Sequence, residues 1–383
     1  MNWIIIDESL IEKLLVTDSI FLCAKNLTLP LVLFLSHYKI MAPAVQFELS
    51  EPPTDAVSSL KYSPYTPNRL LVSSWDKKVY LYNTENVSEG GQLMRTYEHR
   101  APVLDVCFGK DESEAFSAGM DWQVKRIDLE SGEHTVLSTH EAPVKSVVYS
   151  KEHSLLISAS WDKTLHILNL SDPSQSPMTI PLPSKPHSLS LTATKLVVAM
   201  SSRLLYIYSL PLSTDPSQEP WQQRESSLKF MTRAVACMPN DDGYASSSIE
   251  GRVAVEWFDP STESQARKYA FKCHRQPDAT GDGTDIVYPV NALAFHPTHG
   301  TFASGGGDGV VALWDAVAKR RIRQYQKYPT SVAALSFSSD GKYLAVGVCP
   351  GFENGQEDYS GEGLTKVYIR ELGENEAKGK GAK

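Results

Sequence analysis

The sequence lacks the paired cysteines that hold disulfide-bonded and zinc-bonded domains together. Its five cysteines are an odd number, are scattered along the chain and include no pair with CxxC spacing: Cys23, Cys107, Cys237, Cys273 and Cys349. Such a set argues against a disulfide framework and a zinc site, and it favours a reducing compartment, the cytosol or the nucleus. We therefore expect neither a metal nor a cofactor.

Positive charge is also scarce. The 383 residues carry 37 lysines and arginines against 45 aspartates and glutamates, a formal net charge of -8 at pH 7. Nucleic acids and membrane surfaces both attract proteins that have a basic field. The composition therefore predicts no direct binding to nucleic acid or to a membrane, and any basic site must be local.

Long hydrophobic runs are missing as well. The first 40 residues contain apolar patches, but their cleanest apolar run, residues 29–35, is seven residues long and includes Pro30. A membrane-spanning helix needs about 20 residues, and the segment lacks the basic start of a secretory signal. We expect residues 1–40 to be a poorly ordered extension outside the fold, for which a start codon upstream of Met41 is one explanation. An amphipathic helix that binds a membrane or a partner is the alternative.

The familiar catalytic motifs are absent too. The chain has no GxSxG, HExxH or GxxxxGK[ST] segment. The glycine run at 304–311 has no lysine and leads into a strand, and the acidic stretch at 278–285 lacks the spacing of a calcium loop. These observations predict a binding protein rather than an enzyme. An enzyme of a new kind remains a hypothesis that turnover of a candidate substrate would support.

What the sequence does contain is a sevenfold repeat. Each unit begins with an alternating apolar strand, continues through a polar turn and a strand of small residues, and closes with an acidic turn and another alternating strand. The units cover residues 56–85, 102–130, 143–171, 186–210, 232–259, 289–316 and 331–372. Units of about 47 residues are typical of propeller blades, which stack because one sheet cannot bury both of its faces alone.

The repeat predicts an all-β fold, a seven-bladed WD40 β-propeller over residues 41–372, followed by a flexible tail at 373–383. Closing the ring removes the exposed strand edges. We expect residues 44–50 to close it as an outer strand beside residues 365–372 of the last blade. Three histidines precede first strands, and we expect them to hydrogen-bond to serines and aspartates of the turns rather than to catalyse a reaction; they are His99, His140 and His274.

A cluster of cations stands out in this acidic chain. Its members belong to unit five and the approach to unit six, so we expect them to be neighbours on one face of the ring: Lys229, Arg233, Arg252, Lys272 and Arg275. Guanidinium groups donate paired hydrogen bonds to carboxylates and phosphates. A single surface cation is usually only solvated, but a cluster of them predicts a site for an anionic peptide. Arg252 follows a tight turn and begins a strand, which would direct its guanidinium group at the partner.

From Met41 onward the chain resembles the budding-uninhibited-by-benzimidazole WD-repeat family of the mitotic spindle checkpoint. The motifs that carry the resemblance are "SSLKYSP", "LLVSSWD", "RESSLKFMTR", "SSIEGRVAVEWFDP", "KYAFKCHR", "YPVNALAFHP" and "SGGGDGVVALWD". The related WD-repeat mRNA export factors, which dock on a nucleoporin, share the "SSIEGRVAVE" and "FKCHR" type segments. They typically lack the Asp after the Trp of the first blade, where this chain has Trp75-Asp76.

The resemblance implies a spindle-checkpoint adaptor that acts in the nucleus and, in mitosis, at the kinetochore, with the cytoplasm as a further location. The implied partners are a checkpoint kinase and its pseudokinase-like partner, which it binds through a Glu-rich motif. It also implies a kinetochore scaffold with phosphorylated Met-Glu-Leu-Thr motifs, and the mitotic checkpoint complex as a further partner. The alternative is an mRNA export adaptor at the nuclear pore.

The resemblance also implies which residues make these contacts. Arg233, Arg252 and Lys272 would meet the acids or the phosphate of the partner. Lys272 stands where some family members have Arg, and Arg275 is a weaker candidate. Two tryptophans would line the surface beside the cations or else serve only in blade packing: Trp75 and Trp161.

Overall fold

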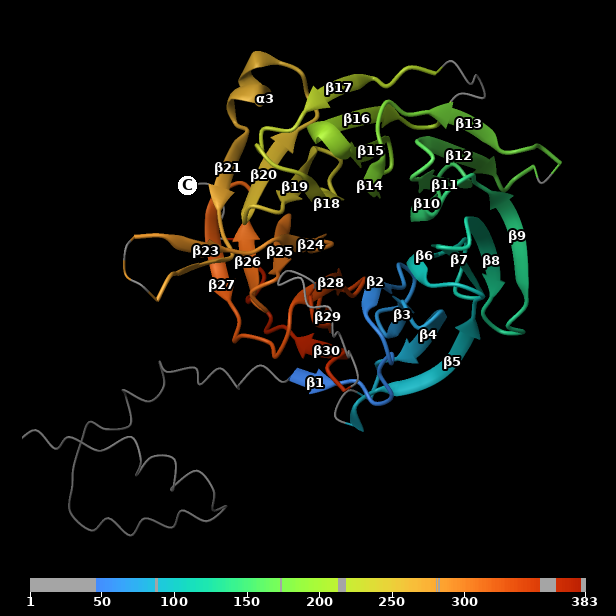
Figure 1. Cartoon of the computed structure of the whole chain (residues 1–383), viewed down its shortest axis with the longest axis horizontal. Helices are drawn as coiled ribbons and strands as arrows, with labels where there is room; N and C mark the ends of the chain where they lie inside the picture. Colours follow the sequence, from blue (N-terminus) through green and yellow to red (C-terminus); the bar gives the residue numbers. More distant parts are fainter. Residues whose placement is uncertain are drawn as a thin grey trace, which may run out of the picture. The chain divides into compact units, whose positions relative to one another are not determined.

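A computed structural model describes residues 46–86, 89–172, 174–212, 218–279, 281, 283–351 and 363–379. Residues 1–40, predicted to be an extension, lie outside these ranges. Within them the chain forms seven antiparallel four-stranded sheets and one two-stranded sheet. Figure 1 shows the seven sheets arranged around a common axis, as the blades of a propeller. The predicted seven-bladed, all-β fold is confirmed.

The blades are numbered in chain order, and their strands run from the axis outward. Blade one is β2 (Val57–Tyr62), β3 (Arg69–Ser74), β4 (Lys78–Asn83) and β5 (Gln92–Glu98). Blade two is β6 (Val103–Phe108), β7 (Glu114–Gly119), β8 (Gln123–Asp128) and β9 (His134–Thr139). Blade three is β10 (Val144–Ser150), β11 (Leu155–Ser160), β12 (Thr164–Asn169) and β13 (Met178–Pro181).

The remaining blades follow the same order. Blade four is β14 (Pro186–Leu191), β15 (Lys195–Met200), β16 (Leu204–Ser209) and β17 (Gln222–Glu225), with the short 3-10 helix η2 (Ser201–Arg203) after β15. Blade five is β18 (Thr232–Cys237), β19 (Gly243–Ser248), β20 (Arg252–Trp257) and β21 (Tyr269–Lys272), with α3 (Thr262–Ala266) after β20. Blade six is β24 (Val290–Phe295), β25 (Thr301–Gly306), β26 (Val311–Asp315) and β27 (Arg320–Gln324). Blade seven is β28 (Val332–Phe337), β29 (Tyr343–Val348), β30 (Lys366–Glu371) and β1 (Gln46–Glu48).

Burial explains why the second strand of each unit is built from small residues. The inner strands contact one another in order around the axis, and β28 contacts β2. A second strand therefore has a strand on each side within its own sheet and a blade against each face. Strands β7, β11, β19 and β25 are buried at every residue. The outer strands β5 and β27 are mostly exposed, because they form the rim.

The ring closes as the sequence predicts. Strand β1 pairs antiparallel with β30, placing Gln46 opposite Arg370, Phe47 opposite Ile369 and Glu48 opposite Tyr368. Phe47 packs against a core cluster that also contains residues of blade one. The first and last strands of the described ring therefore share one sheet, so no blade is left with an unpaired third strand.

The C-terminal segment differs from the flexible tail that the sequence predicts for residues 373–383. Among the residues described there, Glu376 and Ala377 are buried. Glu376 Oε1 lies 3.3 Å from Arg323 Nη1 of blade six and 3.6 Å from Arg370 Nη2 of blade seven, and Thr301 Oγ1 donates to the carbonyl of Ala377 at 2.7 Å. The segment is therefore packed against the ring as far as residue 377, because the carboxylate of Glu376 contacts two arginines from neighbouring blades.

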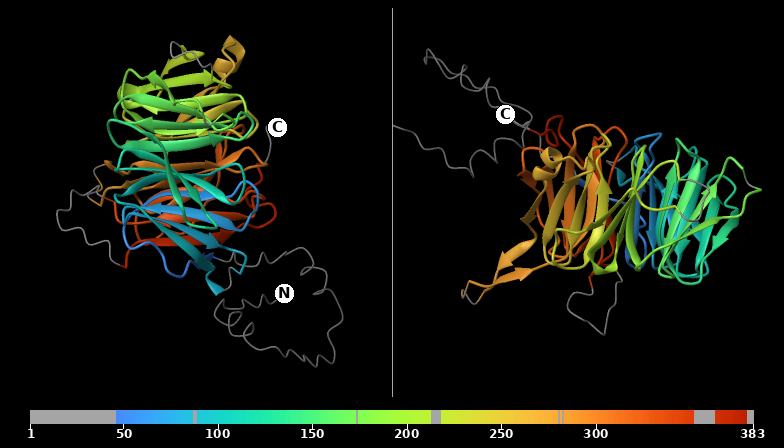
Figure 2. Two further views of the ribbon diagram at one scale, coloured as in Figure 1. Left: turned by 90° about the vertical axis from the view of Figure 1, so that its right-hand side faces the viewer. Right: turned by 90° about the horizontal axis from the view of Figure 1, so that it is seen from above.

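Blades five and six are joined by a hairpin that belongs to neither sheet. It consists of β22 (Arg275–Pro277) and β23 (Asp285–Val287), which pair with each other alone. Figure 2 shows this hairpin projecting from one face of the ring. That face also carries the turns in which the predicted site residues lie.

Candidate functional site

One face of the ring is formed by the turns between second and third strands and by the connections between blades. These segments lie at the same edge of every blade because the strands are antiparallel. Trp75 lies in the β3–β4 turn, Trp161 in the β11–β12 turn, and Arg252 directly after the β19–β20 turn. We call this surface the turn face.

Three of the predicted cations lie at this end of blade five. The strand register pairs Thr232 with Ser248, Ser248 with Arg252, and Arg252 with Lys272, so the four positions form a row across the sheet. Arg233 follows Thr232 on the inner strand and is exposed. Arg233, Arg252 and Lys272 therefore share the turn face, as binding to a single ligand would require.

Arg252 is oriented by an intramolecular carboxylate that the sequence interpretation missed. Its Nε lies 3.5 Å from Oε2 of Glu250, and its side chain is 34% exposed. The turn between them needs glycine, because Gly251 has a φ of +63° and a Cβ there would lie 2.7 Å from the carbonyl oxygen of Cys273. The turn thus packs on the chain that leaves β21. The signal in the sequence was the Glu-Gly-Arg spacing, which places an acid and a base on either side of one tight turn.

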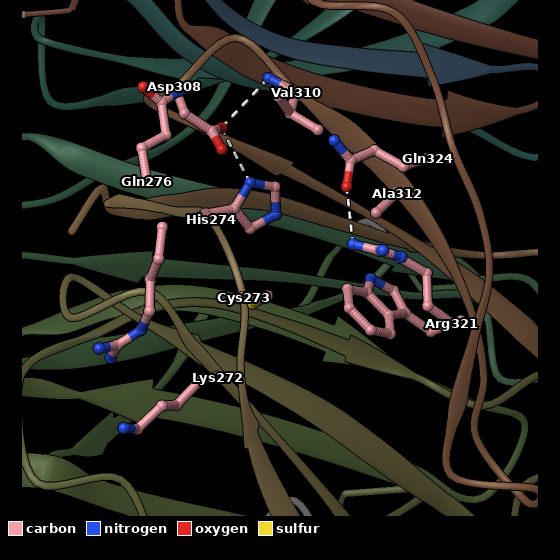
Figure 3. A pocket seen from close by; sticks show the side chains of 11 residues that line it. Lys272, Cys273, His274, Gln276, Asp308, Val310, Ala312, Arg321 and Gln324 are labelled. Carbon is pink, nitrogen blue, oxygen red and sulfur yellow. Dashed lines mark hydrogen bonds and ion pairs between the residues drawn. The ribbon is translucent and has the colours of Figure 1, made fainter. Parts of the chain in front are cut away.

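A cleft of about 260 Å³ lies beside this row, between blades five and six. Figure 3 shows Lys272 on one side of it and Arg321 on the other. Lys272 is exposed, whereas Nη1 of Arg321 donates to Oε1 of Gln324 at 2.7 Å. An anionic group that enters the cleft from the turn face would therefore first meet the exposed Lys272.

Arg275 stabilises the β22–β23 hairpin. Its Nη2 donates to the backbone carbonyl of Glu250 at 2.9 Å, and its Nη1 lies 3.8 Å from Oδ2 of Asp285. Its side chain is only 19% exposed. Because these oxygens already hold the guanidinium group, Arg275 is less available to a ligand than Lys272.

Two residues that line the cleft, His274 and Asp308, form a hydrogen-bonded group with the buried Ser304, but their arrangement is structural. Nδ1 of His274 lies 2.9 Å from Oδ1 of Asp308, and Nε2 lies 2.8 Å from Oγ of Ser304. Trp314 Nε1 also donates to Oγ of Ser304, which is fully buried. His140 makes the matching contacts with Asp162 and Ser158 in blade three.

His99 likewise contacts a serine of its blade, with Nε2 2.8 Å from Oγ of Ser117. Burial lowers the pKa of His99 to about 4, so this imidazole is neutral at physiological pH. The predicted hydrogen bonds to a serine and an aspartate are thus confirmed for His140 and His274, whereas His99 contacts a serine and the carbonyl of Tyr97.

The tryptophans lie on the turn face but not beside the cations. Trp75 belongs to blade one and is 42% exposed, and Trp161 belongs to blade three and is partly buried. The sequence interpretation missed Trp122 of the β7–β8 turn in blade two, which is 47% exposed. Its signal was the pair Asp121-Trp122, which reverses the Trp-Asp order of the neighbouring blades. Three consecutive blades therefore present a tryptophan each, and the cations lie farther around the ring (Figure 1).

Exposed hydrophobic side chains gather on the same face. Among the described residues, twelve large hydrophobic side chains are exposed, and eight of them lie in turns or connections of the turn face. The eight are Trp75, Trp122, Phe230, Met231, Ile249, Ile286, Val287 and Leu364. Met231 and Ile249 are joined by a backbone hydrogen bond of 3.2 Å next to Arg252. Exposed apolar residues gathered beside polar ones are typical of surfaces that bind other proteins.

Across the described ranges, no group of three or more His, Cys, Asp or Glu side chains could hold a metal ion. In the same residues, no helix has the length and the apolar character of a membrane span.

Comparison with known proteins agrees with the fold. A family described as "WD domain, G-beta repeat" matches residues 45–83, 132–169 and 280–315. The "Mitotic checkpoint protein BUB3.1" of Arabidopsis thaliana is 45% identical over 344 residues, which cover 89% of this chain and 96% of that protein. The chain belongs to the Bub3 family of WD-repeat proteins.

Other relatives extend this family placement. The "Mitotic checkpoint protein bub3" of Dictyostelium discoideum is 38% identical over 82% of this chain and 91% of that protein. The "mRNA export factor GLE2" of Chaetomium thermophilum is 32% identical over 86% of this chain and 91% of that protein. The chain is thus similar to both groups of proteins, and its identity to these two Bub3 proteins is higher than its identity to this export factor.

Proposed function

We propose that this protein is a non-enzymatic adaptor of the spindle checkpoint. Its turn face would bind a Glu-rich motif of the checkpoint kinase and of the pseudokinase-like partner, and also phosphorylated Met-Glu-Leu-Thr motifs of the kinetochore scaffold. The adaptor would thereby recruit the kinases to unattached kinetochores. The observation that carries the proposal is the coincidence, on one face, of the row Arg233, Arg252 and Lys272 with most of the exposed hydrophobic side chains.

The two parts of the turn face suit two kinds of contact. The cations of blade five suit a phosphate or a carboxylate, because charge-assisted hydrogen bonds are short and strong. The tryptophans of blades one to three suit the apolar side chains of a peptide. Since the two parts lie on different blades, a ligand that uses both must cross the centre of the ring as an extended chain. A phosphorylated Met-Glu-Leu-Thr motif would need only the blade-five end.

The proposal places the protein in the nucleus and at the kinetochore during mitosis, with the cytoplasm as a further location. Assembly into the mitotic checkpoint complex would follow from binding the kinase partner. The relatives named as mitotic checkpoint proteins support this assignment.

A peptide titration tests the proposal. The protein, saturated with the Glu-rich kinase motif, is titrated with a Met-Glu-Leu-Thr peptide in phosphorylated and unphosphorylated form, and binding is followed by calorimetry. We expect the phosphorylated peptide to bind about tenfold more tightly or better, because phosphate adds nearly two negative charges and three strong acceptors. A phosphorylated peptide of scrambled sequence is the control. Equal affinities for the first two peptides would reject the proposal.

The second candidate function is mRNA export at the nuclear pore, favoured by the identity with the mRNA export factor. Affinity purification from mitotic cells separates the two functions. Recovery of a nucleoporin without a checkpoint kinase would support the export function. In that case the cations of the turn face should also bind single-stranded RNA with a steep salt dependence.

A further inference from the structure

Every inner strand of the ring carries an irregularity at the same place. The register between the first and second strands shifts after the first paired residue of the inner strand, in all seven blades. A bulged residue is not paired with the neighbouring strand, and its side chain points in a different direction from those of a regular strand. The residues skipped by the shift are, in blade order, Ser58, Leu104, Lys145, His187, Arg233 (with Ala234), Asn291 and Ala333. They form a ring of unpaired positions around the axis, at the turn-face end of the inner strands.

Three neighbouring members of this ring carry basic side chains: Lys145 of blade three, His187 of blade four and Arg233 of blade five. The charge of Lys145 acts on His187, and so does the charge of Arg233. Nε of Arg233 also donates to Oδ1 of Asn291, the next position around the ring, at 3.1 Å. Lys145 and His187 are partly exposed, and Arg233 is exposed.

Around Lys145 the positively charged side chains outnumber the negatively charged ones. Lys145 interacts with the charges of Arg233 and Lys61 as well as with that of Asp105. Within the described residues, Lys145, His187 and Arg233 have no ion-pair partner within 4.0 Å. Asp105 is buried and accepts hydrogen bonds from Ser146 Oγ at 2.7 Å and from the backbone of Val147 at 3.0 Å. Burial and the neighbouring cations lower the pKa of Lys145.

His187 makes the site sensitive to pH. Its Nε2 lies 2.9 Å from Oγ of Ser201, which leaves Nδ1 as the nitrogen that can donate to an anion. Burial lowers the pKa of His187, and the charges of Lys145 and Arg233 lower it further. The free protein therefore holds this imidazole neutral near pH 7. An anion placed among these side chains would favour the protonated form, so it would bind more tightly as the pH falls.

We propose that Lys145, His187 and Arg233 form a binding site for one compact oxyanion at the centre of the turn face. A free phosphate-like ion and a carboxylate at the end of a side chain share the required chemistry. The site shares Arg233 with the surface of the proposed checkpoint function and rests on it to that extent, but it includes neither Arg252 nor Lys272, so variants of Arg252 distinguish the two.

The test measures the pKa of His187 by NMR, with its imidazole resonance identified by its loss in His187→Gln. In the first arm, the pKa of His187 is measured in sulfate and in chloride at equal ionic strength, since sulfate keeps its charge between pH 5 and pH 8. The other arm uses N-acetylglutamate amide, which carries a single side-chain carboxylate. We expect at least one of these probes to raise the pKa of His187 by about one unit, which equals about tenfold tighter binding to the protonated protein by linkage. The probe that does so identifies the source of the oxyanion.

Matched variants decide whether the site is the one described. Lys145→Gln should remove most of the pKa rise, whereas Lys185→Gln, an exposed lysine two residues before His187, should retain it. Arg252→Gln should retain it too, which separates this site from the phosphopeptide row. If neither probe raises the pKa of His187 more than that of His153 on the opposite face, or if Lys145→Gln leaves the rise intact, the inference is wrong.

Discussion

Replacing Arg252 and Lys272 together by glutamine is expected to weaken binding of a phosphorylated Met-Glu-Leu-Thr peptide about a hundredfold. The two side chains are opposite each other on neighbouring strands, so both can contact one phosphate. A hydrogen bond to a charged group contributes about 1.5–3 kcal/mol, and a total loss of about 3 kcal/mol corresponds to a hundredfold change in affinity. Titration calorimetry with the purified full chain measures the effect.

The control for this double variant lies directly before the same strand. Lys268 precedes the other end of β21 and is exposed, so Lys268→Gln removes one positive charge from blade five without touching the turn face. It should bind the phosphorylated peptide within about twofold of the wild type. The double variant should also bind phosphorylated and unphosphorylated peptides alike. If it still discriminated between them by tenfold, the phosphate would have to be bound elsewhere.

Glu376→Ala is expected to lower the free energy of unfolding by about 3 kcal/mol. Removing one partner of a buried ion pair costs about 3–5 kcal/mol, because the other charge stays buried without compensation. The lower end applies here, since Arg323 is 44% exposed and remains hydrated, whereas Arg370 is only 13% exposed. Urea unfolding of the full chain, followed by circular dichroism, measures the difference.

The same segment offers a matched control. Glu374 is two residues away and exposed, so Glu374→Gln changes the charge of the segment without disturbing the contact between blades. It should alter the free energy of unfolding by less than about 0.5 kcal/mol, as is usual for surface substitutions. A loss below 1 kcal/mol in Glu376→Ala would mean that the C-terminal segment does not hold blades six and seven together.

The strand order of the ring could be predicted because the sequence of each unit contains the complete pattern of one blade. Alternating apolar residues, short polar turns and a strand of small residues encode one four-stranded blade within consecutive residues. Closure by residues 44–50 was predictable for a related reason, since the last unit lacks one outer strand and the first segment matches it. The position of Arg252 after a glycine turn was also readable from local sequence, although its ion pair with Glu250 was not predicted.

Contacts between blades could not be predicted from the patterns within single units. Glu376 is acidic and stands in a polar, glycine-containing end of the chain, which in sequence indicates a flexible tail. It is buried because Arg323 and Arg370 are brought together by two adjacent blades. Trp75 and Trp161 were predicted either to line the surface beside the cations or to serve only in blade packing. The sequence could not decide between these roles, because repeat positions indicate the face on which a residue lies but not its distance around the ring.

The sequence by itself determined the number of blades, the order of their strands and the face on which the basic residues lie, because these depend on patterns within single units. Only the tertiary structure decided which side chains of different units meet. Lys145, His187 and Arg233 are each more than 40 residues apart in the chain, and no local pattern marks them as a group. They occupy equivalent positions on adjacent inner strands, because all seven inner strands bulge at the same level and the ring closes around one axis.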